Sequence, residues 1–79
     1  MQQLTLYHFM SCPYCLKVRN YLQKAGITIP MKDTLADPKN RQELIKIGGK
    51  PQVPCLIING KALYESDDII EWLRKNWKG

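Results

Sequence analysis

The chain has 79 residues and a net charge of +5, and 44% of its residues are hydrophobic and 24% charged. This composition excludes a disordered chain, and the length favours one compact domain spanning residues 1–79. No apolar stretch approaches the ~20 residues that a membrane helix needs, and the scattered lysines and arginines argue against a nucleic-acid partner.

The first third of the chain has the pattern of a strand, a helix and a second strand. Leu4–Phe9 is rich in strand-forming residues, and Pro13 suits the first position of a helix. Gly26 is a natural left-handed end to that helix. Ile27–Met31 then forms the second strand, and Pro30 places it at a sheet edge. The apolar side of the helix is formed by Cys15, Val18, Leu22 and Ala25.

A second helix follows, because Asp37 is a capping residue and Pro38 favours the first turn. Leu44, Ile45 and Ile47 form its apolar side, and Gly48-Gly49 ends it.

The last third predicts a hairpin and a third helix. Cys55–Ile58 and Lys61–Tyr64 flank Asn59-Gly60, which is typical of a type I′ turn because both turn residues need positive φ. Ser66 is then expected to cap the final helix. Its first turn carries Asp67 and Asp68, and its core-facing stripe is Ile69, Ile70, Leu73 and Trp77, with Trp72 beside it. This order predicts an α/β fold whose four-stranded mixed sheet carries helices on both faces.

Cys12 and Cys15 form a Cys-x-x-Cys motif that follows a strand and opens a helix, which is the redox form of the motif. We expect Cys12 to be exposed at the helix start and to attack as a thiolate, which the helix dipole favours, and Cys15 to point inward and resolve the mixed disulfide. Lys17 and Arg19 are the nearest cations that could add to this activation. Since Met1–Leu6 also lacks the features of a secretory signal, the reducing cytoplasm is the expected location.

Zinc is the alternative chemistry for this motif. The chain offers only Cys12, Cys15, Cys55 and His8 as a set, without the usual second pair of ligands, so we expect no metal. Cys55 is either a third redox thiol or a small buried residue, and its place at the start of an apolar strand favours burial.

Three segments together resemble the glutaredoxin family: Cys12-Pro13-Tyr14-Cys15, Gln52-Val53-Pro54 and Glu65-Ser66-Asp67-Asp68. The resemblance extends over nearly the whole chain. It is closest to the glutaredoxin-2 type, whose N-terminal domain is similar to that of glutathione transferases. It implies a thioredoxin fold, glutathione as co-substrate, protein and small-molecule disulfides as partners, and a monomer.

The resemblance also implies roles for individual residues. Val53-Pro54 corresponds to a cis-proline corner that pairs with the cysteinyl part of glutathione, and Ser66 with Asp67 to the pair that holds its γ-glutamyl end. The remaining glutathione contacts would come from Tyr14, Arg41 and Gln52, with Lys50 near the same region.

Two departures qualify the resemblance: Phe9, and Cys55 immediately after the expected cis-proline. Phe9 stands where most glutaredoxins carry a lysine near the thiolate, so less cationic activation is expected here. Two chains could alternatively share a [2Fe–2S] cluster through Cys12 and glutathione, although Pro13 and Tyr14 are larger than the residues that cluster-holding members carry there. A complete glutathione transferase is not expected, because 79 residues leave no room for a second, helical domain.

Overall fold

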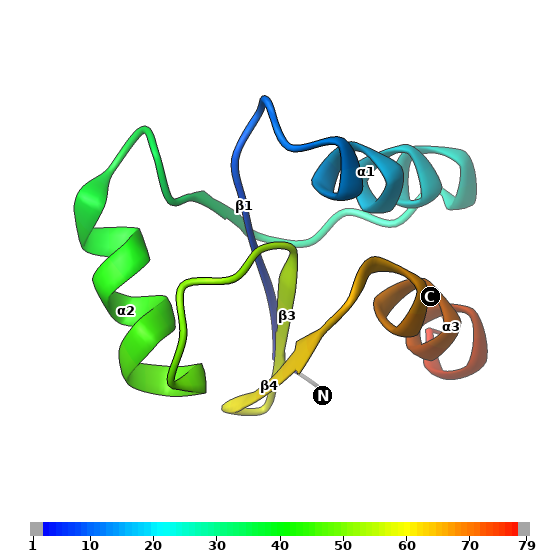
Figure 1. The fold of residues 1–79 in the computed structure, drawn as a ribbon. Helices are drawn as coiled ribbons and strands as arrows, with labels where there is room; N and C mark the ends of the chain where they lie inside the picture. Colours follow the sequence, from blue (N-terminus) through cyan, green and yellow to red (C-terminus); the bar gives the residue numbers. More distant parts are fainter. Residues whose placement is uncertain (1–2, 78–79) are drawn as a thin grey trace.

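The computed structural model describes residues 3–77, so the first two and last two residues of the predicted 1–79 domain lie outside the described part. Figure 1 shows seven elements in the predicted strand–helix–strand–helix–strand–strand–helix order. They are β1 (Leu4–His8), α1 (Pro13–Ala25), β2 (Met31–Asp33), α2 (Pro38–Gly48), β3 (Cys55–Ile58), β4 (Lys61–Tyr64) and α3 (Ser66–Asn76).

The four strands form one mixed sheet in the order β2-β1-β3-β4. β1 runs parallel to β2 and antiparallel to β3, and β3 pairs with β4 as a hairpin. Asn59 and Gly60 join the hairpin with φ values of 51° and 88°. Both angles are positive, which confirms the predicted turn.

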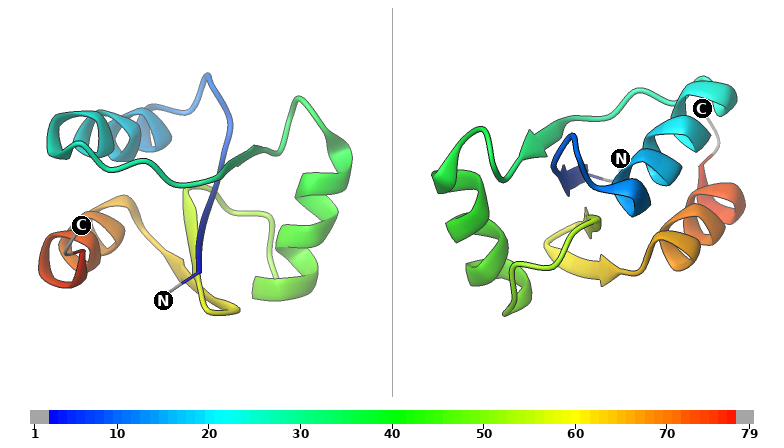
Figure 2. Two further views of the ribbon diagram at one scale, coloured as in Figure 1. Left: turned by 180° about the vertical axis from the view of Figure 1, so that it is seen from behind. Right: turned by 45° about the horizontal axis from the view of Figure 1, so that its top comes forward.

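The helices cover both faces of the sheet, as predicted. α1 and α3 lie together on one face and α2 lies on the other, and both views in Figure 2 show this division. A hydrophobic core lies on each face of the sheet. The strands contribute to both cores, because successive side chains of a strand point to opposite faces. Leu4, Leu6 and Leu56 pack under α1 and α3, whereas Tyr7, Cys55 and Ile57 pack under α2.

The second strand lies later in the chain than predicted. Pairing begins at Met31, opposite Leu6, and the predicted segment Ile27–Pro30 is a connection outside the sheet. Ile27 and Ile29 are nevertheless buried, so the apolar pattern marked core residues that are not strand residues. Pro30 has no backbone N–H to donate to a neighbouring strand. Its carbonyl accepts one hydrogen bond from the backbone N–H of Leu6 in β1, at 3.0 Å.

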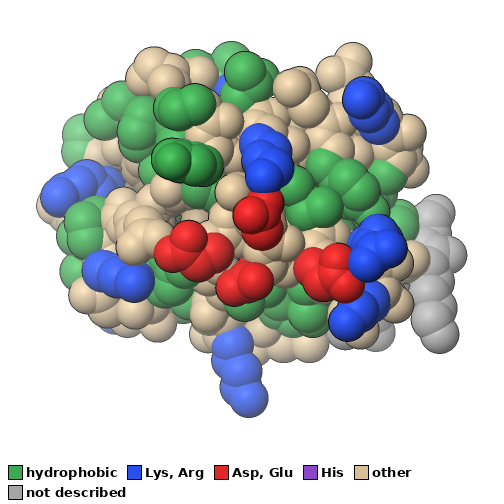
Figure 3. All heavy atoms as spheres, turned by 45° about the vertical axis from the view of Figure 1, so that its right-hand side comes forward, with side chains coloured by type: hydrophobic (Ala, Val, Ile, Leu, Met, Phe, Trp, Pro, Cys, Tyr) green, Lys and Arg blue, Asp and Glu red, His purple; other side chains and the backbone are tan. Residues whose placement is uncertain are grey.

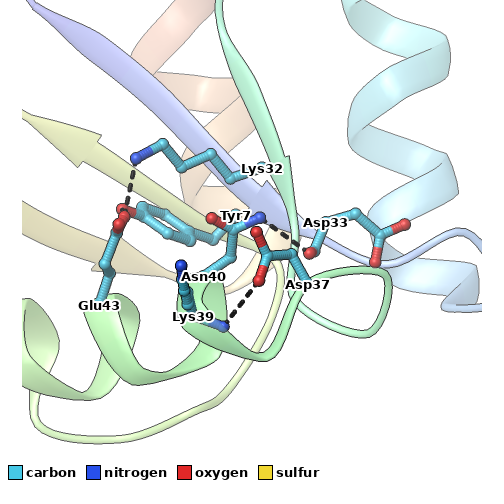
Figure 4. A network of polar contacts seen from close by, with 7 residues as sticks. All are labelled: Tyr7, Lys32, Asp33, Asp37, Lys39, Asn40 and Glu43. Atoms are coloured by element: carbon cyan, nitrogen blue, oxygen red, sulfur yellow. Dashed lines mark hydrogen bonds and ion pairs between the residues drawn. The ribbon is translucent and has the colours of Figure 1, made fainter.

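A polar network fixes α2 against the sheet, as Figure 4 shows. Asp37 caps the helix by accepting from the backbone N–H of Lys39 at 3.0 Å. Across the sheet, the Tyr7 hydroxyl donates to Oε1 of Glu43 at 3.0 Å, and Lys32 Nζ donates to the same oxygen at 2.7 Å. α2 is therefore tied to both β1 and β2.

The C-terminal ends of α1 and α2 and the two tryptophans lie where the sequence predicts them. Gly26 ends α1 and Gly49 follows α2, both in the left-handed conformation. Trp72 and Trp77 are partly buried against the α1–α3 core. No helix within residues 3–77 has the length and apolar character needed to cross a bilayer.

Candidate active site

The loop before α1 is a tight turn that presents Cys12 at the helix start. The carbonyl of Phe9 accepts from the backbone N–H of Cys12 at 3.2 Å, which turns Phe9 out of β1, so the strand ends at His8 and not at Phe9 as predicted. Pro13 then occupies the first turn, and the Cys12 carbonyl accepts the first helical bond from Leu16 at 3.0 Å. Cys12 is thus the N-terminal cap of α1.

The sulfur of Cys12 turns back over the helix end. Sγ of Cys12 accepts from the backbone N–H of Cys15 at 3.3 Å, so it satisfies one of the free donors of the first turn. This inward turn buries Cys12, which the sequence pattern does not predict. Cys12 was expected to be exposed, yet only 6% of its surface is, while Cys15 is fully buried as predicted.

The other two thiols lie in apolar surroundings. Burial raises the pKa of Cys15 to about 12, and its contact with Cys12 adds to the rise. Burial likewise raises the pKa of Cys55 to about 11. Cys55 belongs to the cluster under α2, on the sheet face opposite α1, so the structure supports the buried interpretation of this residue.

The two candidate cations of α1 point to different partners. Nζ of Lys17 forms a hydrogen-bonded ion pair with the carboxylate of Asp67 on α3. Arg19 instead turns toward the loop before Cys12 and donates to the carbonyl of Met10 at 3.3 Å.

A pocket of about 600 Å³ lies beside the start of α1. It gathers side chains from the first turn of α1, the loop before β3 and the start of α3. The Val53–Pro54 peptide in that loop is cis, as the glutaredoxin resemblance implies. The lining residues are Tyr14, Gln52, Val53, Pro54, Glu65, Ser66, Asp67 and Asp68.

Ser66 has a different local role from the predicted one. It is the first residue of α3, the cap position belongs to Glu65, and no side chain caps this helix. Glu65 holds a φ of 73°, which is unusual for a residue with a side chain and is typical of functional sites. Because Ser66 makes no cap bond, its hydroxyl remains available to the pocket that it lines.

The pocket thus brings together Tyr14, Gln52, Val53, Pro54, Ser66 and Asp67 from the predicted set. Arg41 lies elsewhere, as an exposed residue of α2, and Lys50 lies over the ring of Tyr64.

Sequence reasoning missed two lining residues, Glu65 and Asp68. The sequence feature that could have indicated them is the run of acidic residues at the start of α3. That run was explained from the sequence only by the favourable interaction of carboxylates with the positive end of the helix dipole. Figure 3 shows Asp and Glu side chains gathered in the middle of the face that α1 and α3 form, with Lys and Arg around them. The pocket is therefore rimmed by carboxylates, and one of them is paired with Lys17.

The described part of the chain holds no group of three or more His, Cys, Asp or Glu side chains arranged to bind a metal ion. Within the described residues, the four side chains considered for zinc therefore form no such group. The arrangement can support thiol chemistry at Cys12, two residues before the pocket-lining Tyr14.

Comparison with known proteins places this geometry in a family. Residues 6–79 match the model of the glutathione S-transferase N-terminal domain. The chain is 35% identical over 68 residues to prostaglandin E synthase 2 of Danio rerio, covering 86% of this chain but only 17% of that protein. It is 26% identical over 69 residues to glutaredoxin 3 of Escherichia coli K12, covering 87% of this chain and 83% of that one.

Solved structures identify the fold as the thioredoxin fold. The crystal structure of a thioredoxin-like protein superposes with a TM-score of 0.78 at 22% identity, covering 92% of this chain and 97% of that chain. The predicted fold class is therefore confirmed.

Proposed function

This chain belongs to the glutathione S-transferase N-terminal domain family, and on that premise we propose that it is a glutathione-dependent thiol–disulfide oxidoreductase of the glutaredoxin kind. It reduces protein and small-molecule disulfides and removes glutathione from mixed disulfides. The observation that carries the proposal is the sulfur of Cys12, held at the N-terminus of α1 two residues before Tyr14, which lines the pocket. Similarity to glutaredoxin 3 over most of both chains supports the same reaction class.

Cys12 is the nucleophile. The N-terminus of a helix carries partial positive charge, which stabilises an anion there by up to ~2 kcal/mol in favourable geometry. The N–H of Cys15 adds a direct hydrogen bond to the same sulfur. A thiolate on Cys12 attacks one sulfur of a disulfide, the S–S bond breaks, and the leaving thiolate takes up a proton.

Cys15 is the resolving thiol. Its raised pKa keeps it protonated in the resting enzyme, so the two cysteines do not compete as nucleophiles. Once Cys12 holds a mixed disulfide with a protein, Cys15 attacks Cys12 and releases the reduced partner. Two glutathione molecules then reduce the Cys12–Cys15 disulfide, forming glutathione disulfide.

Glutathione occupies the pocket in this proposal. The hydroxyl of Ser66 and the N-terminus of α3 suit the carboxylate of its γ-glutamyl end, and Asp67 suits the ammonium group. The backbone of Val53 pairs with the cysteinyl part, while Tyr14 lines the groove and Gln52 and Pro54 complete its wall. A contact between Arg41 and the glycine carboxylate stays a prediction from the resemblance.

We further propose that residues 1–79 act as one monomeric domain in the cytoplasm, without a metal, membrane or nucleic-acid partner. The relatives differ greatly in length, since the chain spans 83% of glutaredoxin 3 but 17% of prostaglandin E synthase 2. The activity is accordingly proposed for residues 1–79 alone, and not for a longer relative.

The coupled reduction of hydroxyethyl disulfide tests the proposal. Purified protein is supplied with glutathione, glutathione reductase and NADPH, and NADPH oxidation is followed. We expect turnover by the native chain, loss of turnover in Cys12→Ser, and native turnover in the matched control Cys55→Ala, whose thiol lies on the opposite face of the sheet.

Cys15→Ser separates the two routes. This variant should still remove glutathione from a glutathionylated protein, because that route needs one thiol, but it should lose reduction of protein disulfides. No turnover by the native chain with a titratable free Cys12 would reject the proposed activity. Equal loss of both reactions in Cys15→Ser would reject the division of roles.

A further inference from the structure

Arg19 lies on α1 one turn after Cys15 and is not among the residues that line the pocket. One guanidinium nitrogen donates to Sδ of Met10 at 3.4 Å and the other to the Met10 carbonyl at 3.3 Å. Its Nε is buried and has no hydrogen-bond partner among residues 3–77. The side chain therefore clamps the turn that precedes Cys12 and keeps its charge partly shielded from solvent.

Helix geometry places Arg19 next to one thiol of the motif. Cys15 and Arg19 are four residues apart on α1, so they share one face of the helix. The positive charge of Arg19 favours the thiolate of Cys15 and opposes the effect of burial on its pKa. Lys17 has no such role, because its ammonium group is paired with Asp67.

We propose that Arg19 is a positioning residue for the resolving step: it holds the turn that carries Cys12 and places a positive charge beside Cys15 while the Cys15 thiolate forms. This inference rests on the proposed function, since it concerns the second step of that reaction. The inference assigns the charge of Arg19 to the resolving thiol Cys15. The glutaredoxin resemblance, in contrast, implies a cation near the nucleophile.

The step balances in atoms and electrons. In the mixed disulfide, Cys12 Sγ is bonded to the sulfur of glutathione. Cys15 loses its proton to solvent, its sulfur bonds to Cys12 Sγ, and the bond to glutathione breaks. Glutathione leaves as a thiolate with the electron pair and takes a proton, so one disulfide is exchanged for another.

The other titratable groups facing Arg19 do not change charge in the pH range where thiols titrate. Burial and the charge of Arg19 both lower the pKa of His8, so this residue is neutral above pH 7. Backbone N–H groups lower the pKa of Asp33, which stays ionised there. A pH dependence between about 7 and 10 therefore reports on the thiols.

The test follows the two steps separately. Reduced native protein, Arg19→Gln, Arg19→Lys and the control Lys24→Gln are mixed with glutathione disulfide. Lys24 is the basic residue of the last turn of α1, so its replacement removes one charge from the same helix far from the motif. Acid quenching and mass analysis give the rate of mixed-disulfide formation and the rate of its conversion to the Cys12–Cys15 disulfide.

For Arg19→Gln we expect resolution to slow about threefold at pH 7, because the charge of Arg19 is the smallest influence on the Cys15 pKa and a rise of about 0.5 in that pKa lowers the thiolate fraction about threefold. Its pH profile should move to higher pH, while mixed-disulfide formation keeps the native rate. Arg19→Lys keeps the charge and should restore the pH profile, and Lys24→Gln should match the native chain.

The outcomes separate this inference from the function on which it rests. If the native chain forms no mixed disulfide with glutathione, the proposed function itself fails. If the native chain completes both steps and Arg19→Gln resolves at the native rate, or slows both steps equally, Arg19 has no specific role in resolution. If Arg19→Gln does not fold, Arg19→Lys carries the test: a resolution profile that coincides with the native one supports the role of the charge, and a profile moved to higher pH overturns it.

Discussion

The backbone N–H of Cys15 donates to the sulfur of Cys12 at 3.3 Å, while the Cys15 side chain is itself fully buried. The two thiols of this short motif thus differ in their surroundings. The sulfur of Cys12 accepts a hydrogen bond at the helix end, whereas burial raises the pKa of Cys15.

The contrast predicts selective alkylation of the native protein. With limiting iodoacetamide at about pH 8, we expect Cys12 to react and Cys15 and Cys55 to be spared, because burial keeps both of these thiols protonated at that pH. Peptide mass mapping measures the label at each position, and urea-unfolded protein, in which all three thiols react, is the control. Labelling of Cys15 as fast as Cys12 would contradict the distinction.

The same two buried thiols predict loss of stability in alkali. A thiol whose pKa is raised on folding contributes its full stability below the unfolded pKa of ~8.5 and loses it as pH rises toward the folded value. From about pH 7.5 to about pH 9.5, the free energy of unfolding of the reduced chain should fall by roughly 3 kcal/mol for Cys15 and Cys55 together.

Urea unfolding at the two pH values measures this fall. Cys55→Ala should show about half of it, because one of the two titrating thiols is gone. A free energy of unfolding that stays constant across this range would mean that the thiols are not buried as described.

Much of the fold could be predicted because its signals are local. The Asn59-Gly60 turn and the caps Gly26 and Asp37 each depend on a few neighbouring residues, and each lies where the sequence places it. The second strand was misplaced because Ile27 and Ile29 are apolar for core packing, while pairing begins only after Pro30.

The site was predictable to the extent that it depends on contiguous motifs. Segments 52–54 and 65–68 do meet at one pocket, but the orientation of side chains depends on contacts across the fold. The inward turn of Cys12, the ion pair of Lys17 and the clamp made by Arg19 leave no pattern in the sequence.

Ser66 offers a test that separates binding from stability. Since its hydroxyl makes no cap bond, Ser66→Ala should change the free energy of unfolding by less than about 0.5 kcal/mol, yet raise the KM for glutathione about tenfold through loss of a charged hydrogen bond. Asp37→Ala is the matched control, because it removes a true cap and should cost about 1 kcal/mol of stability with KM unchanged. The reverse pattern in the two variants would show that Ser66 is structural.

Gly48 is a position where the packing of α2 on β4 requires the absence of a side chain. A Cβ there would lie 3.0 Å from Ala62 Cβ and from Tyr64 Cζ, and would overlap the Tyr64 hydroxyl. Gly48→Ala should therefore destabilise the chain by about 1–3 kcal/mol through overpacking. Thermal unfolding measures this loss, with exposed Gln42→Ala on the same helix as the control. Equal melting temperatures for the two variants would contradict the packing described.

Trapping the first intermediate tests the central proposal most directly. Cys15→Ser protein is treated with glutathione disulfide, and the adduct is located by intact-mass and peptide mapping. We predict one glutathione per chain, bound to Cys12 and released by free glutathione. An unmodified chain with its Cys12 thiol free, or an adduct located on Cys55, would contradict the assignment of Cys12 as the glutathione-linked nucleophile.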